Sequence, residues 1–72
     1  ESIFGSAFSI VAKGNRIVMS EVAQKVAVYD IAGTLVAQAA NVAEMSVNLN
    51  SGVYIVTATV DGETYAQKVV LR

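Results

Sequence analysis

The sequence predicts a small all-β domain, and three observations support that prediction. The 72-residue chain is 54% hydrophobic and only 15% charged, which excludes a disordered chain and indicates a packed core. Its apolar runs are rich in Val, Ile, Tyr, Phe and Thr, the residues that favour strands. Gly, Asn, Asp or Ser separates these runs at the short intervals typical of a β-sandwich or barrel. We therefore expect a single domain over residues 1–72.

The pattern of apolar runs predicts seven strands. They span about Ala7–Ala12, Arg16–Ser20, Lys25–Asp30, Thr34–Ala39, Met45–Leu49, Val53–Val60 and Glu63–Leu71. The stretch from Gln38 to Glu44 contains Ala, Gln and Glu, which favour helix. A single helical turn and a loose crossover fit this stretch equally well, so both interpretations stay open.

Turn-forming residues mark three connections between these strands. A Gly-Asn pair at 14–15 follows the first strand, and both residue types tolerate a positive φ. Asp30 begins a turn in which Gly33 is the expected left-handed residue. Asp61-Gly62 stands between two alternating runs, which is the strongest hairpin signal in the chain and predicts a type I′ turn.

The two faces of the last hairpin follow from its two-residue loop. Because side chains alternate along a strand, one face turns to the core and the other is partly solvated. The predicted core face comprises Tyr54, Val56, Ala58, Val60, Tyr65, Val69 and Leu71. The opposite face comprises Val53, Ile55, Thr57, Thr59, Thr64, Ala66, Lys68, Val70 and Arg72. On that face Lys68 and Arg72 point the same way, about 13 Å apart at about 3.3 Å per residue.

The composition argues against several classes of function. The chain has no His and no Cys, and its carboxylates are best explained as turn formers or solvated surface charges. We therefore expect no catalytic residue, no cofactor and no metal within these residues. A net charge of −1 argues against nucleic-acid binding. The longest apolar runs, such as Val53–Val56, are far shorter than a membrane-spanning segment.

Three tyrosines leave two interpretations to weigh. Tyr29, Tyr54 and Tyr65 are candidates for an exposed platform that binds glycans or peptides. They are equally candidates for core packing with the hydroxyl reaching an edge. Because Tyr54 and Tyr65 fall on the predicted core face of the hairpin, we favour core packing.

Three segments, in order, resemble one known family. The segment KVAVYDIAGTLV, from Lys25 to Val36, is similar to the V-x-V-Y-D-x-x-G-x-x-V stretch of type IX secretion system C-terminal sorting domains of type A. LNSGVYIV, from Leu49 to Val56, resembles the family's L-x-x-G-x-Y-I-V stretch, and GETYAQKVVLR, from Gly62, resembles its closing G-x-x-x-x-x-K-V-V-x-K. The resemblance begins at about Gly14, so residues 1–13 are the less well defined part of the domain. No Tyr-Pro-Asn-Pro opening is present, and an arginine replaces the closing lysine.

The resemblance implies an immunoglobulin-like antiparallel β-sandwich of about seven strands that acts as an address label. Such a domain follows a cargo domain in the same chain, cargo that has already reached the periplasm. It directs that cargo through the outer-membrane type IX translocon of Bacteroidota, with a shuttle protein, to the cell surface or the medium. A surface sortase usually removes the domain. The positions that fall on the family's signal-bearing segments are Gly52, Tyr54, Lys68, Val69, Val70, Leu71 and Arg72.

The same resemblance suggests how these positions divide their roles. We expect Lys68 and Arg72 to supply the charge register, while Val69 and Leu71 hold the strand in place. The alternative function is an immunoglobulin-like structural, adhesion or carbohydrate-binding module that the mature extracellular protein retains. The aliphatic alternation of the terminal hairpin also allows two copies to pair edge to edge.

Overall fold

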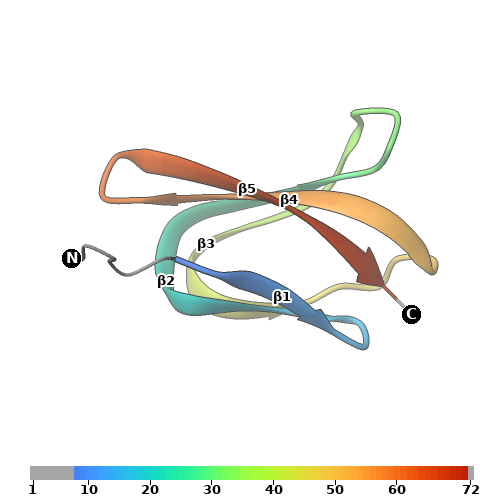
Figure 1. Ribbon diagram of the computed structural model, residues 1–72, viewed down its shortest axis with the longest axis horizontal. Coiled ribbons are helices and arrows are strands. Elements are labelled where there is room, and N and C mark those ends of the chain that lie inside the picture. The colour runs from blue at the N-terminus through green and yellow to red at the C-terminus, as the bar shows by residue number, and fades with distance from the viewer. Residues whose placement is uncertain (1–7, 72) are drawn as a thin grey trace.

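The computed structural model describes residues 8–71, which form five antiparallel strands in one sheet (Figure 1). The strands are β1 (Ile10–Lys13), β2 (Arg16–Tyr29), β3 (Leu35–Ser46), β4 (Gly52–Val60) and β5 (Glu63–Leu71). The sheet order is β1-β2-β4-β5, and β3 pairs with β2. Over the described residues there is no helix, and hence none long and apolar enough to cross a membrane.

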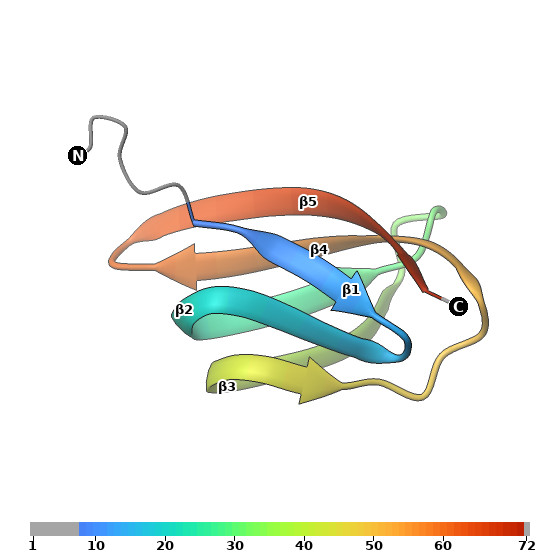
Figure 2. The ribbon, with the colours of Figure 1, turned by 60° about the horizontal axis from the view of Figure 1, so that its bottom comes forward.

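Strand β2 is long and bent, and its bend shapes the whole domain. Its first part pairs with β1 and its last part with β4, while β3 follows its other edge. The register against β3 shifts between Val18 and Ala23, where a bulge lets the strand turn. The sheet therefore curls into a half-barrel, and Figure 2 shows β2 passing from the side of β1 to the side of β4.

The expected count of seven strands is wrong, because two pairs of predicted strands are continuous. The runs at 16–20 and 25–30 are the two ends of β2, joined through the bulge. The runs at 34–39 and 45–49 are joined through 38–44 in β3, so this stretch is neither a helical turn nor a crossover. Strand β3 ends at Ser46, and residues 47–49 are not part of a strand. Pairing with β2 outweighs the helical propensity of Ala, Gln and Glu. Asn41, with a φ of 57°, lies in β3 opposite the β2 bulge region.

Two further expectations need correction at the level of architecture. The strands form one curled sheet, so a sandwich of two separate sheets is not confirmed. The first strand begins at Ile10, later than predicted, and Ala7 lies outside the described residues. What remains of the prediction is the all-β class and the antiparallel pairing, both of which are confirmed.

The core lies on the concave face of the curled sheet. It comprises Ile10, Ile17, Met19, Ala23, Val26, Val28, Val47, Tyr54, Val56, Ala58, Val69 and Leu71. Burying one aliphatic side chain of this size contributes about 1.5–3 kcal/mol. Every strand except β3 supplies a buried residue, and β3 adds half-buried ones such as Val42 and Met45. The small domain thus depends on a dense aliphatic core that closes over both halves of β2.

The predicted turns are confirmed. Asp61 and Gly62 have φ angles of 51° and 83°, as a type I′ turn requires, and Val60 pairs with Glu63 across them. In the turn between β2 and β3, the Asp30 carboxylate accepts hydrogen bonds from two backbone N–H groups, each at 2.9 Å. The register of the β4–β5 hairpin agrees with the predicted one along its whole length.

Candidate functional site

The candidate signal residues of β5 divide between the two faces of the sheet. Val69 and Leu71 point into the core, with only 5% and 2% of their surface exposed. Lys68 and Val70 alternate with them, and both side chains are exposed on the other face. Arg72 lies outside the described residues. Within this strand a partner can therefore reach the side chains of Lys68 and Val70, whereas Val69 and Leu71 are covered.

Gly52 and Tyr54 lie where β4 meets the end of β5. Gly52 pairs with Leu71, and Tyr54 pairs with Val69. The Tyr54 ring is buried, and its hydroxyl donates a 2.8 Å hydrogen bond to the backbone carbonyl of Asn50. A Cβ at Gly52 would stand 3.9 Å from the Tyr54 ring, so the ring packs closely along the backbone there. These two residues position the C-terminal half of β5 and are not themselves an exposed binding surface.

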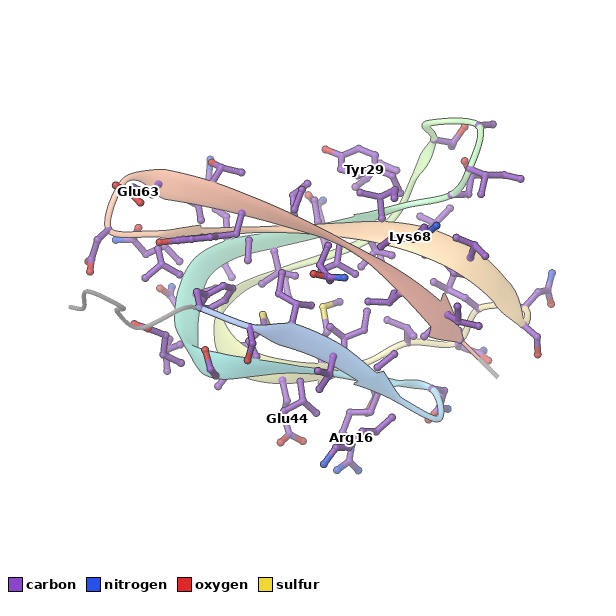
Figure 3. The ribbon with its side chains drawn as sticks, in the orientation of Figure 1. Arg16, Tyr29, Glu44, Glu63 and Lys68 are labelled. Atoms are coloured by element: carbon purple, nitrogen blue, oxygen red, sulfur yellow. The ribbon has the colours of Figure 1, made fainter. Side chains whose placement is uncertain are left out.

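The outward-facing side of β2, β4 and β5 forms the candidate recognition surface, which we call the convex face. It comprises Lys25, Ala27, Tyr29, Val53, Ile55, Thr57, Thr59, Thr64, Ala66, Lys68 and Val70. Its central row runs across three strands, because Ile55 pairs with Tyr29 on one side and Lys68 on the other. Figure 3 shows Tyr29 and Lys68 on this outer side of β4 and β5, with Arg16 and Glu44 on the opposite side of the domain.

Sequence reasoning assigned β4 and β5 to this face but missed the contribution of β2. Tyr29 and Lys25 join the face only because β2 pairs with β4 in a fixed register. That pairing is between strands far apart in the sequence, and no turn residue specifies it. The sequence does indicate which way these side chains point. Val26 and Val28 are buried, so the residues that alternate with them must face outward, and these are Lys25, Ala27 and Tyr29.

The charge on the convex face is of one sign. Lys25 and Lys68 are its ionisable groups besides Tyr29, and among the described residues it carries no carboxylate. Asp30, just past the end of β2, directs its carboxylate into its own turn. Glu44 pairs with Arg16 at 3.4 Å on the far side of the molecule. The face is therefore apolar and cationic, although the chain as a whole carries a net charge of −1.

The opposite end of the hairpin has a different character. Glu21, Asp61 and Glu63 surround the Tyr65 hydroxyl, which donates a 3.2 Å hydrogen bond to Glu63. This hydrogen bond, reinforced by the neighbouring carboxylates, raises the pKa of Tyr65 above its ordinary value of 10.0. The Tyr65 ring packs on Phe8, with ring centroids 5.0 Å apart. Across residues 8–71, no three His, Cys, Asp or Glu side chains are placed to hold a metal ion.

The three tyrosines do not share a surface. Tyr54 is buried on the concave side, Tyr29 is half-buried on the convex face, and Tyr65 is half-buried against Phe8. Core packing is confirmed for Tyr54, whereas Tyr29 faces away from the core and Tyr65 packs on Phe8. A flat platform of several aromatic rings, such as a glycan-binding module uses, is not assembled from these residues.

The chain enters and leaves the domain at opposite ends. The domain measures 36 × 20 × 19 Å, and Figure 1 shows the start of β1 at one end of the long axis and the end of β5 at the other. The hairpin turn of β4 and β5 lies at the entry end, and the candidate signal residues lie at the exit end. A domain joined to the entry end therefore leaves the end of β5 accessible.

These features describe a small all-β domain in which the end of β5 lies away from the start of β1. Residues 6–72 match the model of the secretion system C-terminal sorting domain, and the chain belongs to that family, the sorting domains of type IX secretion. Sorting domains of this kind act with the type IX secretion machinery and lead to export to the cell surface or secretion. Comparison with curated proteins and with solved structures finds no match.

Proposed function

We propose that this domain is a folded signal that carries periplasmic cargo through the outer-membrane type IX translocon. The observation that supports the proposal is the alternation along the end of β5. Its buried side chains, Val69 and Leu71, fix the strand on the core, so that Lys68 and Val70 stand in a defined register for a receptor. A shuttle protein and the translocon bind these two exposed side chains, and the fixed spacing of Lys68 and Val70 gives the specificity.

The backbone of β5 adds a second way for a receptor to bind. Within the described residues β5 pairs with β4 alone, so its outer edge offers N–H and C=O groups that another strand can pair with. The Lys68 carbonyl already accepts a 3.0 Å hydrogen bond from the Gln67 side chain, which an incoming strand would have to replace or share. The same edge would serve a homodimer if two isolated copies met. During secretion, we propose that a strand of the receptor pairs with this edge.

Removal of the domain by a surface sortase is the next step of the proposal. Residues 8 and 9 are tied to the domain, since Phe8 packs on Tyr65 and Ser9 exchanges two hydrogen bonds with Ser20. A protease needs an extended and accessible backbone, and this anchored segment does not offer one. We therefore place the cleavage upstream of Phe8, after which the cargo is attached to the surface or released.

The experiment that tests the proposal is a fusion of the chain to the C-terminus of a fluorescent reporter with a signal peptide. The fusion is expressed in a type IX-competent bacterium of the Bacteroidota and in a translocon-null strain. We expect the reporter at the surface or in the medium of the first strain and in the periplasm of the second. A folded, intact fusion that stays in the periplasm of the competent strain would contradict the proposal and favour a retained structural or carbohydrate-binding module.

A further inference from the structure

We propose that the convex face is a docking surface for a protein of the secretion machinery that presents apolar side chains flanked by carboxylates. This inference rests on the proposed function and extends the recognition surface from β5 across β4 to β2. The starting observation is the row formed by Lys68, Ile55 and Tyr29, in which residues of three strands stand side by side. A receptor that reads Lys68 therefore also meets Ile55 and Tyr29.

The shape of the convex face favours a partner with protruding side chains. A shallow hollow lies beside Tyr29, and its lining includes Lys25, Ala27, Gln38 and Ala40. The two alanines leave space that larger side chains would fill. An apolar side chain of the partner fits against the alanines and the Tyr29 ring, and a carboxylate next to it reaches Lys25.

Exposed aliphatic side chains continue this surface toward the end of β5. Val53 and Val70 pair across β4 and β5, and they are 39% and 48% exposed. Leu35, at the start of β3, pairs with Tyr29 and is 46% exposed. Contiguous exposed apolar residues with a polar margin are typical of protein interaction sites.

The charge of the convex face distinguishes between three possible partners, which are a second copy of the domain, an anionic membrane and another protein. A second copy docked face to face would bring Lys25 and Lys68 of both copies together with no carboxylate from the described part of the face to offset them. An anionic membrane would attract these lysines, but the segments that bind membranes by charge use roughly four to eight Lys or Arg. Two lysines around an apolar centre instead match a protein surface with a few acidic groups, where they set register and orientation.

The test uses the reporter fusion with two double substitutions of equal charge change. Lys25→Glu with Lys68→Glu reverses the charge of the convex face, and Lys13→Glu with Arg16→Glu applies the same change on the side away from it. The control turns the exposed ion pair of Arg16 with Glu44 into a pair of like charges, whose repulsion exposure and salt keep small. Ile55→Thr keeps a β-branched residue in β4 while removing apolar surface. Thermal unfolding of the purified fusions verifies that each variant is folded.

We expect the convex-face double variant to lower surface delivery about tenfold or more, with the control close to wild type. Ile55→Thr is expected to lower delivery as well. Wild-type delivery from the convex-face variant, or equal losses in both double variants, would overturn this inference and with it the recognition role of Lys68. Translocon-dependent export of the wild-type fusion would still support the sorting function. A wild-type fusion that fails to leave the periplasm would instead contradict the proposed function itself.

Two direct measurements separate a protein partner from a lipid. A photoreactive phenylalanine analogue in place of Ala66, on the convex face, is expected to cross-link to a component that is missing from the translocon-null strain. The same analogue in place of Val22, exposed on the β2 bend, is expected not to do so. Flotation with phosphatidylglycerol vesicles should leave the wild-type fusion unbound. Vesicle binding that depends on Lys25 and Lys68 would overturn the assignment to a protein.

Discussion

The two ends of the β4–β5 hairpin are built from the same strands but differ in chemistry. At the turn end, Asp61 and Glu63 make the surface acidic, and the half-buried Tyr65 packs on the segment that enters the domain. At the far end, Val69 and Leu71 are buried while Lys68 faces outward. The turn end thus anchors the segment at Phe8, and the far end presents a cation on the outer face.

In the function that we propose, this difference separates attachment from recognition within one short domain. The hairpin runs along the long axis, so its two ends are as far apart as the domain permits (Figure 1). Side chains that fix the strand alternate with side chains that are displayed, and the alternation is a consequence of the strand itself. A change at the far end should therefore affect export, while a similar change at the turn end should not.

The largest effect is expected from deleting the last five residues, from Lys68 onward. The deletion removes the buried Val69 and Leu71 together with the exposed Lys68 and Val70, so the strand end loses both its anchor in the core and its exposed side chains. We expect export of the reporter fusion to be abolished while the fluorescence of the reporter in the periplasm is kept. Normal export of the truncated fusion would refute the role of the β5 end.

The next largest effect is a loss of stability, which we compare between two neighbouring residues of β5. Leu71→Ala removes a buried side chain and should lower the free energy of unfolding by about 2–5 kcal/mol. Val70→Ala removes an exposed one and should change it by about 0.5 kcal/mol or less. Urea unfolding of the two purified fusions measures both values. Equal losses for the two variants would show that the assignment of faces is wrong.

The smallest expected effect is a pH-dependent change in stability that Tyr65 causes at the turn end. The hydrogen bond to Glu63 holds the pKa of Tyr65 above 10.0, so the unfolded chain loses this proton first as the pH rises. The stability from this group is therefore full below about pH 10 and is lost as the pH rises through the folded pKa. Ultraviolet titration of tyrosinate should show a transition above pH 10 that Tyr65→Phe removes. Glu63→Gln should bring its pKa closer to 10.0, and an unchanged titration would argue against this hydrogen bond.

The hairpin and its faces could be predicted from the sequence because local signals determine them. Asp61-Gly62 sets the register, and alternation then assigns Val69 inward and Lys68 outward. The count of strands could not be predicted, because the gap at 21–24, which holds Glu21 and Gln24, resembles a loop although β2 continues through it with a bulge. The place of Tyr29 on the recognition surface was missed for a related reason, since only the long-range pairing of β2 with β4 puts it beside Ile55.

One measurement tests the contrast between the two ends most directly. Lys68→Glu and Glu63→Lys reverse a single exposed charge at opposite ends of β5, in reporter fusions that are otherwise identical. Surface reporter is measured for both variants in the type IX-competent strain, with thermal unfolding as the control for folding. We expect Lys68→Glu to lower surface delivery and Glu63→Lys to leave it near wild type. Equal delivery from the two variants, or a loss confined to Glu63→Lys, would contradict the claim that the far end of β5 is the recognised end.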